Sequence, residues 1–215
     1  MMKISGYVWL FLFLCGAVIH PAIGQDQLTG KALVAVLRQG GYNIYFRHAA
    51  TDWSKDDHVT IKGDWTSCDP EKMRQLSAEG RAVAQRIGKA IQDLGIPIGR
   101  VMSSEYCRTR ETAQCLGLGP VTPTRAIMNM RAAEFVGGQD AVIERARRAL
   151  SIPPQEGTNT VFVAHGNLMR AVSGAYTGEA GAAVFFPQGN GEFQLVAQLT
   201  PEDWEMLARQ FAHAE

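Results

Sequence analysis

The run TVFVAHGN, residues 160–167, decides the fold of this chain. Its residues 161–163 are an uninterrupted apolar stretch, which is typical of a central strand that a parallel sheet buries on both faces. The glycine and asparagine at its end begin a predicted helix over 167–175. Ligands of open α/β sheets bind at the carboxyl ends of the strands. The run therefore predicts an α/β protein with His165 at its ligand-binding edge.

Two other segments repeat this arrangement. YNIYFRH (residues 42–48) ends in Arg47 and His48, and SSEYCRTRET (residues 103–112) is an arginine-bearing turn after a third predicted strand. Arginine pairs with phosphate oxygens through two parallel charge-assisted bonds, and imidazole is a competent nucleophile near neutral pH. Alone, the Arg47–His48 pair would more often cap a carbonyl and face water. A second histidine at an equivalent strand end favours a phosphate site attacked by nitrogen.

The remaining sequence alternates between helical and strand patterns. Apolar periodicity, with Gly and Pro at the breaks, predicts helices at 26–39, 78–94, 108–116, 140–150, 167–175 and 201–214. Strands are predicted at 42–47, 98–102, 121–124, 160–164, 182–186 and 193–199, the last two flanking a Gly-Asn-Gly hairpin turn. We expect a three-layer α/β sandwich with a mainly parallel sheet, helices on both faces and an antiparallel edge hairpin. Segments 49–74 and 125–138 lack periodicity and are predicted to be irregular.

The first 24 residues are interpreted as a signal peptide. Lys3 precedes an apolar run over residues 7–19, which is shorter than the ~18 residues of a spanning helix, and small residues follow it. We expect cleavage after Gly24, a single domain over 25–215, a periplasmic or secreted location and no stable membrane insertion. The alternative is an uncleaved membrane anchor.

Charge is balanced along the chain, with 21 basic and 21 acidic residues. A chain of this kind has no general attraction for nucleic acid or for acidic membranes, so no nucleic-acid partner is predicted. Any preference for anions must therefore be local.

Three cysteines follow the leader, namely Cys68, Cys107 and Cys115. Cys107 and Cys115 lie two helical turns apart, roughly 12 Å, which exceeds the reach of a disulfide. Any internal bridge must then include Cys68, and we favour Cys68–Cys107 because it ties the long loop beside Arg108. The alternative is three buried thiols. No closely spaced cysteines or histidines suggest zinc, so no metal is predicted.

The motifs resemble those of one family. RHAATDW (residues 47–53) resembles the Arg-His-Gly-x-Ser/Thr-Glu-Trp signature of the histidine phosphatase superfamily, in its phosphoglycerate-mutase-like branch. SSEYCRTRETA (residues 103–113) resembles the second arginine motif of that branch, and VAHG (residues 163–166) its second-histidine motif. Ala49 departs from the signature, because it replaces the glycine after the catalytic histidine.

The resemblance implies phosphoryl transfer without a cofactor. His48 would become phosphohistidine, while neighbouring cations and His165 neutralise charge on the phosphoryl oxygens. The residues implied to bind the substrate are Arg47, Thr51, Ser104 and Arg108.

The resemblance also implies a carboxylic acid that protonates the leaving oxygen and later activates water. The family places this acid in a Leu-x-Glu-x-x-Phe-Gly run, and the corresponding run here is MRAAEFV, residues 130–136. Direct alignment puts Ala132 at the acid position. Glu134, two residues later, is the best candidate, with Glu105 and Asp52 as rivals.

The expected function is that of an exported phosphomonoesterase acting on a phosphorylated small molecule or glycan. A sugar phosphate, or a phosphate of the lipopolysaccharide core, is the substrate that the resemblance to a periplasmic subgroup implies. Alternatives are a non-catalytic phosphate-binding or interaction protein on the same fold, and a metal-dependent hydrolase. Arg131 is a candidate contact for an extended anionic substrate, and several loop residues either line the entrance or are merely solvated: Lys55, Asp56, Asp57, His58 and Trp65.

Overall fold

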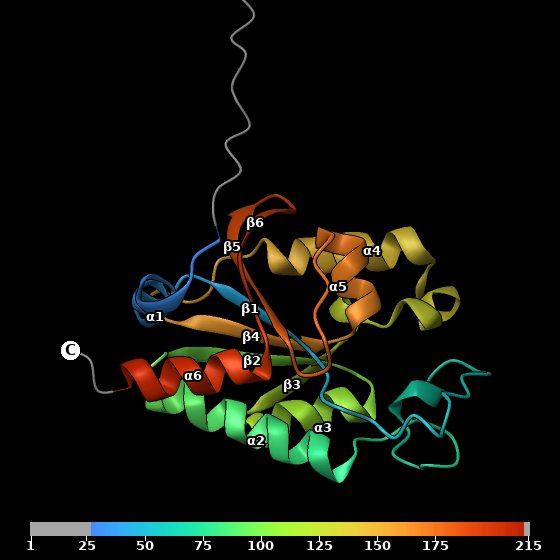
Figure 1. Ribbon diagram of the computed structural model, residues 1–215. Helices are drawn as coiled ribbons and strands as arrows, with labels where there is room; N and C mark the ends of the chain where they lie inside the picture. Colours follow the sequence, from blue (N-terminus) through green and yellow to red (C-terminus); the bar gives the residue numbers. More distant parts are fainter. Residues whose placement is uncertain (1–26, 213–215) are drawn as a thin grey trace, which may run out of the picture.

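The computed structural model describes residues 27–212, which fold around one six-stranded sheet of order β3-β2-β4-β1-β5-β6 (Figure 1). The predicted signal peptide, residues 1–24, lies outside the described residues. The strands are β1 (Asn43–Arg47), β2 (Ile98–Ser104), β3 (Val121–Thr124), β4 (Asn159–Ala164), β5 (Ala182–Gly189) and β6 (Glu192–Leu199). The helices are α1 (Gly30–Gln39), α2 (Ala78–Asp93), α3 (Cys107–Leu116), α4 (Gln139–Leu150), α5 (Gly166–Ser173) and α6 (Pro201–Phe211).

The predicted sheet is confirmed in its strands and directions. Strands β3, β2, β4 and β1 run parallel, whereas β5 pairs antiparallel with β1 and with the edge strand β6. The β5–β6 turn contains Asn190 and Gly191, both at positive φ, as an Asn-Gly hairpin turn requires.

Helices cover both faces of the sheet, as Figure 1 shows with α2, α3 and α6 on one side and α4 and α5 on the other. Alternation along β1 produces the two cores: Ile44 and Phe46 pack with α1, α2, α3 and α6, while Tyr45 packs with α4 and α5. Strand β4 divides its residues in the same way, Val161 and Val163 against Phe162. The three-layer sandwich predicted from the sequence is therefore confirmed. No helix within residues 27–212 is long and apolar enough to cross a membrane.

Several predicted boundaries differ from the structure: β2 and β5 extend to Ser104 and Gly189, two and three residues beyond their predicted ends, and α5 ends at Ser173 rather than at residue 175. Helix α1 begins at Gly30 rather than at residue 26, because the backbone N–H of Leu28 bonds to the carbonyl of Val196 in β6 at 2.7 Å. The two segments predicted to be irregular contain short 3-10 helices, η1 (Asp64–Thr66), η2 (Arg125–Ile127) and η3 (Met130–Val136). Such short turns leave no apolar period in the sequence.

Adjacent parallel strands set the position of the two histidines. Arg47 at the end of β1 pairs in register with Ala164 at the end of β4, so His48 and His165 leave the sheet side by side. The backbone N–H of His48 donates to the carbonyl of Ala164 at 2.9 Å. The buried Tyr45 hydroxyl donates to the carbonyl of His165 at 2.9 Å and accepts its N–H at 3.1 Å. These hydrogen bonds fix the end of β1 next to the end of β4.

Candidate active site

A cavity of about 260 Å³ lies at the carboxyl ends of β1 and β4. Five of its lining residues are arginines, and among the lining residues only Asp57 carries a carboxylate. The arginines come from strand β1, the long loop, the starts of α3 and η3, and the last turn of α5. The cavity is lined by Arg47, His48, Trp53, Asp57, Arg74, Arg108, Asn129, Arg131, His165, Gly166, Asn167, Arg170 and Tyr176.

The ring of His48 is held as a neutral nucleophile. Its Nδ1 lies 2.9 Å from the carbonyl oxygen of Ala49, and since a carbonyl only accepts, Nδ1 must carry the proton. Nε2 then has a lone pair without a hydrogen-bond partner among residues 27–212, and the ring lines the cavity. Burial, followed by the positive charge of Arg108, holds the pKa of His48 well below its ordinary value of 6.5. The ring is therefore uncharged near neutral pH.

His165 is fixed as the opposite tautomer. The amide oxygen of Asn129 accepts from Asn167 at 2.8 Å and from the backbone N–H of Arg131 at 3.0 Å, so its nitrogen must face His165. That nitrogen donates to Nδ1 of His165 at 3.0 Å, and Nε2–H then donates to the Ser104 hydroxyl at 2.9 Å. Burial and Arg108 lower the pKa of His165 well below 6.5. The ring lies 5.8 Å from that of His48, centroid to centroid.

Arg47 lies against the first turn of α5. Its guanidinium donates to the hydroxyl of Tyr176 and to the carbonyl of Thr177, both at 3.3 Å, and lies 3.8 Å from Glu179. A Cβ at Gly166 would come within 3.0 Å of the Arg47 side chain. Glycine at this position thus lets the guanidinium approach the N-terminus of α5, whose free amides also favour an anion.

Arg108 and Asp57 form a buried, two-point ion pair. The two terminal nitrogens of Arg108 donate to the two oxygens of Asp57 at 2.8 and 2.9 Å, and the side chains are only 1% and 4% exposed. The Nε–H of Arg108 is buried without a partner among the described residues. Arg108 therefore keeps a donor for a further anion while Asp57 holds its far side.

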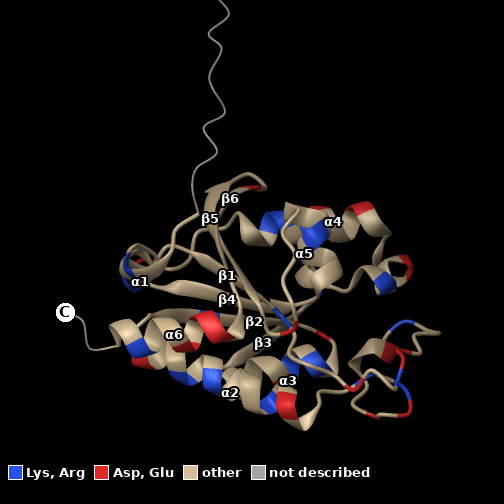
Figure 2. Cartoon of the chain, in the orientation of Figure 1, with Lys and Arg blue, Asp and Glu red and all other residues tan. Residues whose placement is uncertain are grey.

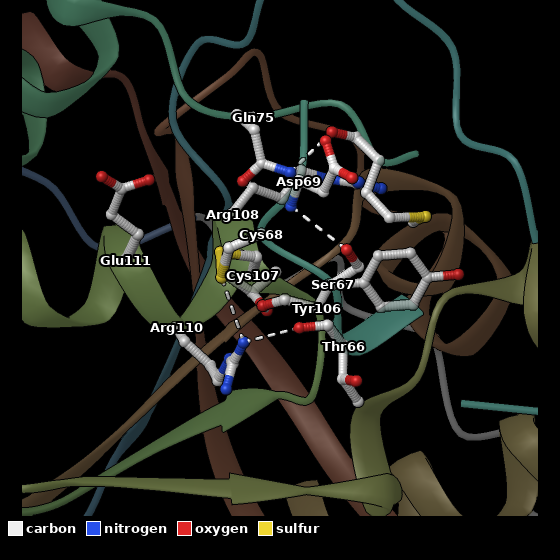
Figure 3. The surroundings of a disulfide bond; sticks show 12 residues. Thr66, Ser67, Cys68, Asp69, Gln75, Tyr106, Cys107, Arg108, Arg110 and Glu111 are labelled. Carbon is white, nitrogen blue, oxygen red and sulfur yellow. Dashed lines mark hydrogen bonds between the residues drawn. A yellow bond between two sulfur atoms is a disulfide. The ribbon is translucent and has the colours of Figure 1, made fainter. Parts of the chain in front are cut away.

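A disulfide between Cys68 and Cys107 fixes the loop that carries Asp57, and the favoured pairing is confirmed. The two Cα atoms are 5.3 Å apart, and Cys107 directly precedes Arg108. Figure 3 shows Arg110 beside the bridge, where it donates to the carbonyl of Thr66 at 2.8 Å. Cys115 remains a free thiol. The cross-link joins the loop to the start of α3 next to the ion pair.

Three predicted site residues do not line the cavity. Thr51 is buried and its hydroxyl lies 3.4 Å from Glu179, while the hydroxyl of Ser104 contacts His165. Glu134 is exposed on η3, because the same turn buries Ala132 and Ala133. The structure thus does not bring Glu134 to the two histidines.

The two rival acids also lie outside the cavity. Glu105 accepts the indole N–H of Trp65 at 2.9 Å and pairs with Arg125 at 3.1 Å. Asp52 is exposed and accepts from Ser54. The candidate acids named from the sequence therefore leave Asp57, from the long loop, as the carboxylate at the site.

Several lining residues carried little signal in the sequence. Arg170 lies four residues after Gly166 and thus on the same face of α5, a spacing that could have identified it. Asn129 caps η3, yet a cap is recognisable only beside a predicted helix. Arg74 stacks on Trp53 at 3.9 Å within the aperiodic loop, where no pattern indicates its direction.

We predict that both histidines stay neutral at pH 6, His48 with its proton on Nδ1 and His165 with its proton on Nε2. Long-range ¹H–¹⁵N correlation spectra would show both tautomers, and protein unfolded in urea serves as the control, since its histidines titrate near pH 6.5. Because folding lowers both pKa values, the unfolded state binds more protons, and stability is lost as the pH falls below about 6.5. A doubly protonated ring at pH 6 would contradict the assignment.

No group of three or more metal-ligating side chains (His, Cys, Asp or Glu) lies close enough together within residues 27–212 to hold a metal ion.

Comparison with known proteins places this geometry in context. A sequence model of the histidine phosphatase superfamily (branch 1) matches residues 44–152, which include His48 and Arg108. No curated protein matched the chain.

Solved structures share the fold. The protein histidine phosphatase SixA complexed with tungstate superposes with a TM-score of 0.53 at 14% identity, over 75% of this chain and 98% of that one. The product of open reading frame Rv3214 from Mycobacterium tuberculosis gives a TM-score of 0.50 at 22% identity, over 75% and 98%. A phosphoserine phosphatase variant from Entamoeba histolytica, in complex with phosphoserine, gives 0.50 at 15%, again over 75% and 98%.

Proposed function

The chain belongs to branch 1 of the histidine phosphatase superfamily, and from that membership and the geometry of its cavity we propose that it is a phosphomonoesterase that acts through phosphohistidine at His48. One observation carries the proposal: the bond from Nδ1 to the Ala49 carbonyl leaves the Nε2 lone pair free in a cavity lined by arginines. A neutral ring with its lone pair turned toward an anion pocket is a nucleophile for phosphorus.

In the first step, Nε2 of His48 attacks phosphorus and the bond to the leaving oxygen breaks, with the electron pair going to that oxygen. Arg47, Arg108 and the N-terminus of α5 stabilise the charge on the phosphoryl oxygens, and such fixed donors are each worth roughly 3 kcal/mol. A weakly basic leaving group, such as an aryl oxide, departs without taking a proton, whereas the more basic oxygen of a sugar takes its proton from water at the open side of the cavity.

In the second step, water attacks the phosphoryl group and the P–N bond breaks, returning the electron pair to Nε2. Asp57 is the carboxylate of the cavity, and its bidentate pair with Arg108 indicates the ionised form that accepts a proton from water. Because Asp57 is held as a carboxylate, we assign it only the second part of the role for which the sequence suggested Glu134, the activation of water.

Export is part of the same proposal. The leader-like residues 1–24 and the Cys68–Cys107 disulfide support a location outside the reducing cytosol, where phosphorylated small molecules or glycans such as sugar phosphates or core phosphates are the substrates. If the leader is cleaved as proposed, protein recovered from a periplasmic fraction will have the intact mass of a chain that begins at Gln25.

The test is to trap the covalent intermediate. Brief reaction with ³²P-labelled aryl phosphate, followed by an alkaline quench, is expected to leave acid-labile label on the peptide that contains His48. A phosphate-binding protein without activity would carry no label. Steady release of phosphate with no label on His48, or with acid-stable label on a hydroxyl, would refute the proposal.

A further inference from the structure

The cavity carries more positive charge than one phosphoryl group can balance. Five guanidinium groups line the cavity against Asp57 and the nearby Glu179, which is an excess of three charges, and a phosphomonoester supplies at most about two negative charges. On the outer helices, by contrast, both signs of charge are interspersed (Figure 2). The surplus is therefore a property of the cavity and not of the whole surface.

Two of the five arginines, Arg131 and Arg170, are exposed and have neither an ion pair nor a side-chain hydrogen bond among the described residues. Of the other three, Arg108 pairs with Asp57 and Arg47 lies near Glu179, whereas Arg74 forms no ion pair but is buried and stacks on Trp53. Arg131 and Arg170 are thus the two cations of the cavity that are available to bind a second anion.

Both arginines are held close to the phosphoryl site. Arg170 and Arg47 each place their guanidinium carbon 5.8 Å from the centre of the Tyr176 ring, so this ring links the two. Arg131 follows Asn129, whose amide bonds to its backbone N–H and to His165. Burial and the charges of Arg108 and Arg131 lower the pKa of Arg74, which reflects crowding of like charges here.

The cavity is large enough for a phosphoryl group but not for the rest of the substrate. About 260 Å³ is below the ~300–1,000 Å³ of typical small-molecule pockets, so the cavity holds little beyond the phosphoryl group. The organic part must then lie across the rim, which the exposed Trp53 and Tyr176 form together with the two unpaired arginines.

We propose that Arg131 and Arg170 form a second anion subsite, and that the substrate is a phosphomonoester whose organic part carries another phosphate or a carboxylate. The subsite rests on the proposed phosphatase activity, because it selects the ester that His48 attacks. Guanidinium groups suit either anion through charge-assisted hydrogen bonds.

The test compares esters that differ only in a second charge. The substrates are phenyl phosphate with a ring carboxylate, with the neutral methylamide of that carboxylate, and with a non-hydrolysable phosphonomethyl group. We expect the wild type to prefer an anionic ester over the neutral one at least tenfold in kcat/KM. The wild-type ratio of kcat/KM for each anionic ester over the neutral ester is compared. The larger of the two ratios shows whether the second anion is a carboxylate or a phosphate-like group.

The double variant Arg131→Gln with Arg170→Gln is expected to lower this preference at least fivefold. Leaving-group chemistry cancels, because each ratio uses the same two esters. Arg209→Gln, an exposed arginine on α6, is the matched control and should keep the wild-type ratio. An equal ratio in wild type and double variant, or no preference in the wild type, overturns the subsite while turnover of phenyl phosphate upholds the phosphatase. Absence of turnover with every ester refutes the phosphatase itself.

Discussion

Replacement of His48 by asparagine is expected to lower kcat/KM for an aryl phosphate by a factor on the order of 10⁴ or more. The amide nitrogen of asparagine can occupy the place of Nδ1 and still donate to the carbonyl of Ala49, so the bond that orients the ring at 2.9 Å is preserved. The atom that is lost is Nε2, the proposed nucleophile. Release of the aryl alcohol, followed by absorbance, measures the effect.

Two measurements separate loss of the nucleophile from loss of the fold. Binding of inorganic phosphate, measured by calorimetry, should remain in His48→Asn, because the arginines that line the cavity are unchanged. His58→Asn is the matched histidine control, since His58 is exposed on the same loop and does not line the cavity. Its kcat/KM should stay within about twofold of the parent, as for other exposed sites. Parental turnover by His48→Asn would rule out phosphohistidine at this position.

Replacement of Arg108 by methionine is expected to damage both activity and stability. Removing one fixed donor to the phosphoryl oxygens costs about 10²–10³ in kcat/KM. The same change leaves Asp57 as a buried charge without its partner, which costs about 3–5 kcal/mol in the free energy of unfolding. Urea unfolding, with an unchanged m-value, measures the loss in the free energy of unfolding.

A companion substitution separates these two effects. In the double variant Arg108→Met with Asp57→Asn, no unpaired charge remains, so most of the stability should return while turnover stays low. The exposed pair Lys89–Asp93 is a control, because Lys89→Met should change stability by less than about 0.5 kcal/mol. Recovery of turnover in the double variant would contradict the roles assigned to both residues. Full stability of Arg108→Met would contradict the buried pair.

The parts of the site that the sequence predicted lie next to regular elements. His48, Arg47 and His165 follow apolar strand runs, and Arg108 lies in the first turn of a predicted helix. Because parallel strands end at one edge, local patterns were sufficient to bring these four together. The Gly-Asn-Gly turn likewise predicted the antiparallel edge hairpin, which the structure has as β5 and β6.

The parts that the sequence did not predict lie in aperiodic segments. Asp57 reaches the cavity through contacts with Arg108 and the backbone of Arg74, which are distant in sequence or carry no periodic signal. Glu134 points outward because η3 buries the two alanines before it, and a 3-10 turn rotates side chains differently from the extended run that the alignment assumed. Ser104 lies at the expected strand end, yet its hydroxyl bonds to His165.

The disulfide has a practical consequence for anyone who prepares this protein. Cys68 and Cys107 are 39 residues apart, and closing a loop of that length removes about 4 kcal/mol of chain entropy from the unfolded state. Material made in a reducing cytosol and material folded with an oxidant are therefore two different samples. In the first, the segment that carries Asp57 is anchored by noncovalent contacts alone, so the thiol content of a preparation belongs beside any rate measured with it.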